Sequence, residues 1–242
     1  MFESAGSRII WRLKEQTLWV EPWGRDSIRV RATTLAEMPL RDWSLLAPKK
    51  APVKIAIEKT SARLVNGKLT ATVDAKGRVR FFKSGSKEPL CEEIFARTNY
   101  PASRTFKSVG GDLSRCEASF TAFDDERIYG LGQRRHGLLD QKGCILELTH
   151  RNSQISIPFL VSSRGYGLLW HNPGMGRVEL GRTQTRWVAD ETSRAMGRRF
   201  RRSRYFFNGN RPLSFGGGAV LRGGLAVYFM LFMTSEYYAL AI

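Results

Sequence analysis

Short runs of alternating apolar and polar residues recur along the first 190 residues of the chain. Examples are TLWVEP, SIRVRATT, VKIAIE, KLTATVD and RVRFFKSG, and turn-forming stretches such as WGRD separate them. A strand places successive side chains on opposite faces of a sheet, so a period of two favours strands joined by turns. A spacing of roughly 8 to 12 residues between such runs is typical of a sandwich. We therefore predict an all-β fold, an antiparallel β-sandwich, with no long amphipathic helix before residue 190.

The charge balance of the chain is strongly basic. Among 242 residues there are 39 Lys and Arg and 22 Asp and Glu, which gives a formal net charge of +17. Such an excess is typical of proteins that bind nucleic acid, an anionic surface or an acidic partner. The excess is uneven, because seven Arg and one Glu lie within residues 196–242, whereas the charges of residues 1–195 are dispersed.

The cysteines, the start of the sequence and the apolar runs bear on the cellular compartment of the chain. Cys91, Cys116 and Cys144 are odd in number and have no CxxC spacing, so neither a zinc site nor a disulfide framework is expected. The start, MFESAGSRIIWRLKEQ, has no secretory pattern. The longest apolar run, Gly223 to Met233, is about half of the roughly 20 residues that a membrane span needs. We expect a cytoplasmic protein that does not contact a membrane.

The sequence changes character after Ala195. Residues 196–242 begin with MGRRFRRSRYFFNGNRPLSFGGG, which is rich in Arg, Gly and aromatic residues, and the strand pattern does not continue. We therefore divide the chain into residues 1–195, the sandwich, and residues 196–242, an irregular tail that is either a frame-shifted or recombined end or a divergent extension. Arg side chains interleaved with Tyr205, Phe206 and Phe207 could bind single-stranded nucleic acid through phosphate contacts and base stacking. No nucleic-acid fold signature accompanies them, so this partner is not expected.

Motifs for catalysis, cofactors and metals are absent from the sequence. The carboxylates Asp124, Asp125 and Glu126 of FDDERIYGLGQ are expected to be neighbours in a solvated turn, whereas glycoside hydrolysis needs two carboxylates that face each other across the bond. The histidines lack metal-ligand spacing, no serine lies in a GxSxG elbow, and GGGAVLRGG lacks the Lys-Ser/Thr of a phosphate loop. We expect no catalytic residue, no cofactor and no metal. The long segment from Glu88 to Asp112 is either a plain connection or a functional loop.

The stretch RNSQISIPFLVSSRGYGLLWHNP pairs polar residues with an alternating apolar run. We predict that the run packs inward as core through Ile155, Ile157, Phe159 and Val161. Tyr166 and Trp170 either pack beneath it or cover the apolar face of a pyranose. The preceding polar residues, His150, Arg151 and Asn152, offer donors and acceptors suited to sugar hydroxyls, and are either substrate-binding or structural.

Three quoted stretches of this chain resemble one family. ERIYGLGQ, GLLDQKGCILELTHRNSQISIPFLVSSRGYGLLWHNP and GRVELGRTQTRWVAD are similar to the N-terminal β-sandwich of family 31 glycoside hydrolases, the α-glucosidases and α-xylosidases. The resemblance covers roughly residues 2–195 and implies a galactose-mutarotase-like sandwich. In that family the sandwich precedes a (β/α)₈ barrel that holds both catalytic aspartates, and it contributes a loop over the sugar site. His150, Arg151 and Asn152 match that loop by position.

The departure from the family begins at Met196. A barrel of about 250 residues cannot form from the remaining 47. The resemblance therefore implies a non-catalytic domain that binds carbohydrate and supports a barrel, inactive alone, with an α-glycoside as a weakly bound ligand and the missing barrel as partner. The alternative is a self-standing sugar-binding or structural module with a basic tail.

Overall fold

The structure is a computed structural model that describes residues 1–40, 45–95, 103–110, 113–172, 175–193 and 226–233. All regular elements within these ranges are strands, which confirms the predicted all-β class. The same ranges hold no helix with the length and apolar character of a membrane span. Every strand pair in the sheets is antiparallel, as the period of two predicts.

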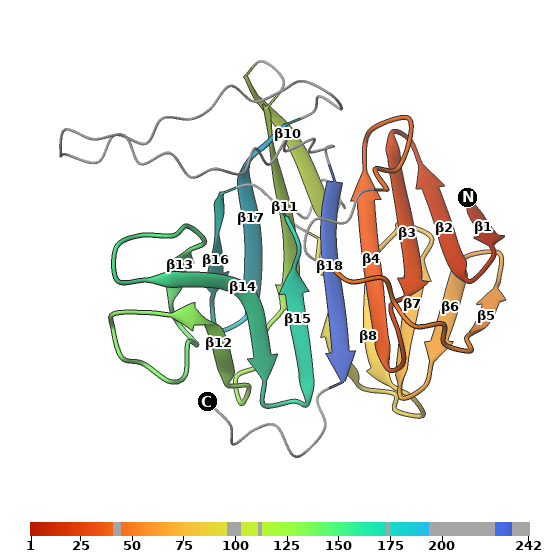
Figure 1. Cartoon of the computed structure of the whole chain (residues 1–242). Helices are drawn as coiled ribbons and strands as arrows, with labels where there is room; N and C mark the ends of the chain where they lie inside the picture. The colour runs from red at the N-terminus through yellow and green to blue at the C-terminus, as the bar shows by residue number, and fades with distance from the viewer. Residues whose placement is uncertain (41–44, 96–102, 111–112, 173–174, 194–225, 234–242) are drawn as a thin grey trace.

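The strands form one large sheet and two smaller sheets (Figure 1). The eight-stranded sheet contains, in spatial order, β1 (Phe2–Ala5), β2 (Arg8–Leu13), β3 (Gln16–Pro22), β4 (Ser27–Thr33), β18 (Ala226–Met233), β15 (Tyr166–Trp170), β14 (Ile155–Ser162) and β12 (Ile128–Gln133). One five-stranded sheet contains β5 (Lys54–Ile57), β6 (Ser61–Asn66), β7 (Leu69–Asp74), β8 (Val79–Lys83) and β9 (Pro89–Glu92). The other contains β10 (Arg104–Gly110), β11 (Leu113–Thr121), β17 (Gln184–Ser193), β16 (Gly176–Leu180) and β13 (Ile145–Glu147).

The two smaller sheets pack side by side against one face of the large sheet. The β5–β9 sheet lies behind β1–β4, and β11, β16 and β17 lie behind the other half (Figure 1). Alternation explains the core, because Leu18 and Val20 of β3 are fully buried while Trp19 between them points to the opposite face. Between the large sheet and the sheet that contains β17, Trp170 of β15 stacks on Trp187 of β17 with ring centroids 5.7 Å apart.

A buried ion pair joins the two smaller sheets. Arg104 of β10 pairs with Glu93, which follows β9, and both side chains are almost completely buried. Arg104 also donates to the carbonyl oxygen of Gly77 at 2.7 Å, and the Val79 N–H donates to Glu93 Oε2 at 2.8 Å. Burial raises the pKa of Glu93, and Arg104 opposes that shift. Several hydrogen bonds compensate the two buried charges, although Arg104 Nε is buried without a partner in the described part of the chain.

Strand β18 lies within the segment predicted to be an irregular tail. Its backbone pairs with β4, from Ala226 opposite Thr33, and with β15, from Met233 opposite Tyr166, so it joins the two halves of the large sheet (Figure 1). The sequence did not predict this strand because AVYFMLFM has no alternation of apolar and polar residues. A continuous apolar run of this length fits a strand paired on both edges, which periodicity alone cannot identify. Residues 194–225 and 234–242 lie outside the described residues, so the boundary at residue 195 stays a prediction.

Candidate functional site

The three predicted site residues lie together at a tight turn before β14. Gln154 donates its N–H to the carbonyl oxygen of Arg151 at 3.1 Å, and Ser153 between them has a φ of 65°. His150, Arg151 and Asn152 are all exposed. The turn therefore presents an imidazole, a guanidinium and an amide to solvent, three planar groups that hydrogen-bond in their own planes.

His150 is tied to the strand that follows it. Its Nδ1 accepts the backbone N–H of Ser156 at 3.3 Å. An accepting Nδ1 leaves the proton of the neutral ring on Nε2, which becomes the free donor of this side chain. The bond thus fixes both the orientation of the ring and the nitrogen that a ligand would meet.

Arg134 holds the neighbouring strands around this turn, and sequence reasoning missed it. Its guanidinium donates to the Glu147 carbonyl oxygen at 2.8 Å, to the Leu131 carbonyl oxygen at 2.9 Å and to Ser156 Oγ at 3.1 Å. It therefore links the ends of β12, β13 and β14. Desolvation lowers the pKa of Arg134. No local pattern distinguishes it from Arg135, its exposed neighbour.

The YGLG motif fixes the register of β12 against β14. Gly132 lies opposite Ser156, next to a bulge in the ladder, and its φ is 89°. A Cβ atom on Gly132 would lie 2.1 Å from the Ile155 carbonyl oxygen. Only glycine combines this backbone conformation with so close an approach, and bulges of this kind aim side chains at strand ends. The motif thus positions the start of β14 and the turn before it.

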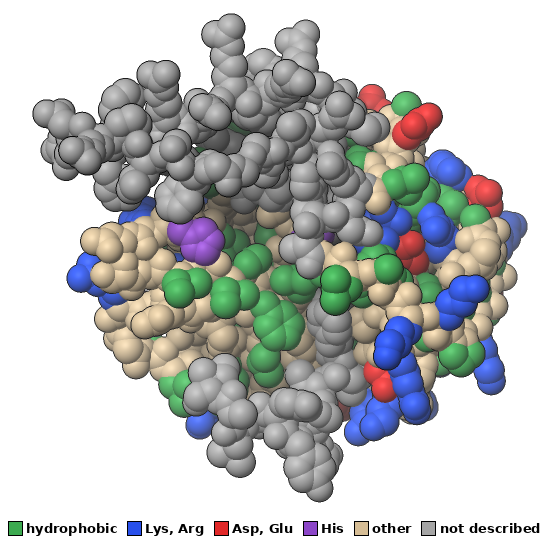
Figure 2. All heavy atoms as spheres, in the orientation of Figure 1, with side chains coloured by type: hydrophobic (Ala, Val, Ile, Leu, Met, Phe, Trp, Pro, Cys, Tyr) green, Lys and Arg blue, Asp and Glu red, His purple; other side chains and the backbone are tan. Residues whose placement is uncertain are grey.

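The apolar alternation of β14 faces outward, so the predicted core orientation is wrong. Ile155 and Ile157 are each 51% exposed, whereas Ser156, Leu160 and Ser162 are buried on the inner face. Alternation shows which residues share a face but does not show which face is interior. Hydrophobic side chains gather on this outer face over β14 and β15 (Figure 2). An exposed apolar patch of this kind is typical of an interaction surface.

Tyr166 and Trp170 belong to the core, which agrees with the first of the two predicted alternatives, packing rather than covering a pyranose. Tyr166 donates its hydroxyl to Glu126 Oε1 at 2.7 Å, and Ser162 donates to the same oxygen. Burial, followed by the charges of its neighbours, raises the pKa of Tyr166. Glu126 is therefore a buried acceptor, although we predicted a solvated turn, while Asp124 and Asp125 are exposed as expected.

The remaining candidates for chemistry form no second site. His171 is buried, and His136 accepts the Leu138 N–H through Nδ1 at 3.1 Å. In the part of the chain that the structure describes, no group of three or more His, Cys, Asp or Glu side chains could hold a metal ion. The candidate site is therefore a polar turn beside an exposed apolar strand face.

Comparison with known proteins identifies the family. Residues 17–179 match the glycosyl hydrolase 31 N-terminal galactose mutarotase-like domain. The chain belongs to this family. Among family 31 relatives, it is 35% identical over 202 residues to the uncharacterized family 31 glucosidase ORF2 of Pseudescherichia vulneris, covering 76% of this chain and 38% of that protein. It is 26% identical over 199 residues to α-xylosidase A of Aspergillus niger, covering 74% of this chain and 27% of that protein.

Solved structures agree with the family assignment. A family 31 α-xylosidase from a soil metagenome, solved in complex with xylose, has a TM-score of 0.78 and 30% identity, covering 97% of this chain and 32% of its own. A Flavobacterium johnsoniae dextranase of family 31 matches with a TM-score of 0.66 and 12% identity, covering 98% of this chain and 26% of its own, and shows the fold alone. The chain thus spans between about a quarter and two fifths of the length of these proteins.

Proposed function

We propose that this chain serves as the non-catalytic N-terminal domain of an α-glycosidase of the α-xylosidase or α-glucosidase type. In this role the outer face of β14 docks the catalytic barrel, and the turn before it contributes hydrogen bonds to the sugar. The observation that supports the proposal most is the continuity of the two features. The exposed turn at His150, Arg151 and Asn152 leads directly into the half-exposed Ile155 and Ile157.

The apolar residues supply affinity for a docked domain. Each isoleucine retains about half of its surface for burial. Full burial of such a side chain contributes roughly 1.5–3 kcal/mol, so covering the remaining half contributes about 1 kcal/mol for each residue. Gly167 extends the face, because a Cβ there would lie 2.8 Å from the Phe159 ring, and its absence lets that ring lie across β15.

The turn residues supply orientation rather than chemistry. His150 Nε2, the Arg151 guanidinium and the Asn152 amide can each hydrogen-bond a sugar hydroxyl, for about 0.5–1.5 kcal/mol net apiece. Association costs at least about 4 kcal/mol, so the turn alone would bind a monosaccharide with a Kd of about 1 mM or weaker. The two carboxylates of a retaining mechanism are assigned to the barrel and not to this domain.

The test is substitution within a protein that carries this domain in front of a family 31 catalytic domain. Asn152→Ala and Arg151→Ala should each lower kcat/KM for aryl α-xylosides or α-glucosides by about fivefold to tenfold, the loss of one hydrogen bond to substrate, with Tm unchanged. Arg182→Ala is the matched control, because Arg182 is an exposed arginine in the β16–β17 turn. Unchanged kinetics for both turn variants, or a fall in Tm that accounts for the lost activity, would assign the turn a structural role only.

A further inference from the structure

The outer face of the β5–β9 sheet is polar and basic. The core-facing residues of β6 include Ala62 and Leu64, so Arg63 between them points away from the large sheet. By the same alternation Thr72 of β7 and Phe82 of β8 point outward. The register places Arg63 opposite Thr72, and Phe82 opposite Thr70. Because the other face of this sheet packs on β1–β4, these side chains are turned away from the turn at 150–154.

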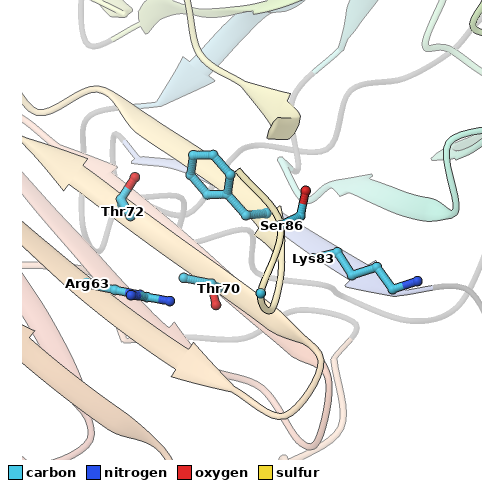
Figure 3. Close-up of a pocket in the computed structure, with 7 residues that line it drawn as sticks. Arg63, Thr70, Thr72, Lys83 and Ser86 are labelled. Carbon is cyan, nitrogen blue, oxygen red and sulfur yellow. The ribbon is translucent and has the colours of Figure 1, made fainter. Parts of the chain in front are cut away.

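These residues surround a hollow of about 180 Å³. Figure 3 shows Arg63, Thr70 and Thr72 on neighbouring strands, with Lys83 and Ser86 on the other side. Hydrogen bonds hold the rim in place. Thr70 Oγ1 lies 3.0 Å from Ser84 Oγ, which donates to the Gly67 carbonyl oxygen at 3.0 Å. The hairpin between β8 and β9 is thereby anchored over the strands, and the hollow is a built feature rather than a gap between mobile side chains.

One cation, Arg63, faces the hollow without a counter-charge. Lys83 lies opposite the buried Leu69, so its side chain leaves β8 on the face away from Phe82. Arg63 is exposed and forms no ion pair within the described residues. Among those residues, the lining contains no Asp or Glu. An uncompensated positive charge over a concave polar surface raises the local concentration of anions. A guanidinium in particular matches the fork of a carboxylate.

The other lining groups fit a pyranose ring. Thr72 Oγ1 is buried and has no hydrogen-bond partner in the described part of the chain, a costly state unless a ligand completes it. Phe82 is half-buried and lines the same hollow. An aromatic ring can cover the CH-rich face of a pyranose, while the hydroxyls of the sugar remain free for Thr and Ser side chains.

We propose that this hollow binds a pyranose that carries a carboxylate, a sugar of the uronic acid class. The carboxylate pairs with Arg63, the ring packs on Phe82, and the hydroxyls meet Thr72 and Ser86. This site goes beyond the proposed function and does not depend on it, because none of its residues belongs to the β14 face or its turn.

The experiment is a titration of the full chain at low ionic strength, followed by saturation-transfer NMR of the ligand. The probes are methyl β-D-glucuronide, methyl β-D-glucoside and acetate. The glucuronide should bind in the millimolar range. The glucoside, which lacks the carboxylate, and acetate, which lacks the pyranose ring, should each bind about fivefold more weakly. Arg63→Gln should weaken glucuronide binding about fivefold, and Phe82→Ala should abolish ring saturation transfer, with circular dichroism unchanged in both.

Arg182→Gln is the matched control for charge. It removes one positive charge from an exposed turn of the other five-stranded sheet, and glucuronide binding should not change. Equal binding of glucuronide and acetate would identify a general anion site and overturn the proposal. Equal binding of glucuronide and glucoside, or equal losses for Arg63→Gln and Arg182→Gln, would overturn it as well.

Discussion

Replacing Gly132 by alanine tests whether the YGLG motif holds the β12–β14 register through a steric requirement. Gly132 has a φ of 89°, and a Cβ there would lie 2.1 Å from the carbonyl oxygen of Ile155. The obstacle is backbone within the paired strand, so it cannot rotate away as a side chain can. Gly137 provides the control, because its φ is 71° and a Cβ there would meet nothing within 4 Å.

The two substitutions share one cost and differ in another. An alanine in the left-handed region costs roughly 1–2 kcal/mol at either position. At Gly132 the contact with Ile155 adds the cost of overpacking, typically about 1–3 kcal/mol. We therefore expect the free energy of unfolding to fall by about 1–2 kcal/mol for Gly137→Ala and by about 2–5 kcal/mol for Gly132→Ala.

Urea unfolding followed by circular dichroism measures both variants. A lower midpoint at an unchanged m value reports a loss of stability rather than a change in the denatured state. In a chain of this size each kcal/mol lowers Tm by about 2–4 °C, so the two variants should be clearly separated. Equal destabilisation by the two substitutions would refute the steric account. It would show that Gly132 is required only for its positive φ and not for the close approach of Ile155.

Three further predictions concern other parts of the molecule. Glu93→Ala leaves Arg104 buried without its partner and should lower the free energy of unfolding by about 3–5 kcal/mol, whereas Glu93→Leu combined with Arg104→Met should recover much of that loss in the same urea assay. Hydrogen bonds from Arg186 and Arg177 lower the pKa of Glu179, so the stability that this carboxylate contributes is present above the ordinary carboxyl pKa and is lost as pH falls through the folded pKa. Glu179→Gln should therefore flatten the dependence of the free energy of unfolding on pH in this acidic range. An unchanged pH dependence in that range would contradict the prediction. Ile157→Thr should leave Tm within about 2 °C of the parent chain but reduce binding of a hydrophobic dye, because Ile157 is 51% exposed; a large fall in Tm would show that Ile157 belongs to the core.

The sequence predicts the class of fold well because a period of two directly reflects strand geometry. TLWVEP and SIRVRATT form β3 and β4, and the buried apolar residues of β3, Leu18 and Val20, follow the alternation. In β4 the same pattern is less informative, since Arg29 and Arg31 are buried on the face opposite Val30. Burial on both faces depends on what covers the sheet, and local sequence does not contain that information.

The site is predictable in part for a related reason. His150, Arg151 and Asn152 lie in the turn that the polar stretch before the apolar run indicates, and they are exposed. Arg134 was missed because its role comes from two carbonyl groups and a serine hydroxyl on three separate strands. The direction of β14 was missed because Ile155 and Ile157 look like core residues, and only their position in the folded chain shows that the serines face inward.

The position of β18 has a consequence for how the chain is made. Residue Thr33 of β4 pairs with Ala226, 193 positions later in the sequence. At a synthesis rate of about 5–20 residues per second, β4 emerges roughly 10–40 seconds before its neighbour in the large sheet. During that interval its open edge is a template for pairing with other nascent chains. Completion of the large sheet therefore waits until β18 has been translated, and yield in a cell should depend on chaperones that shield this edge until β18 arrives.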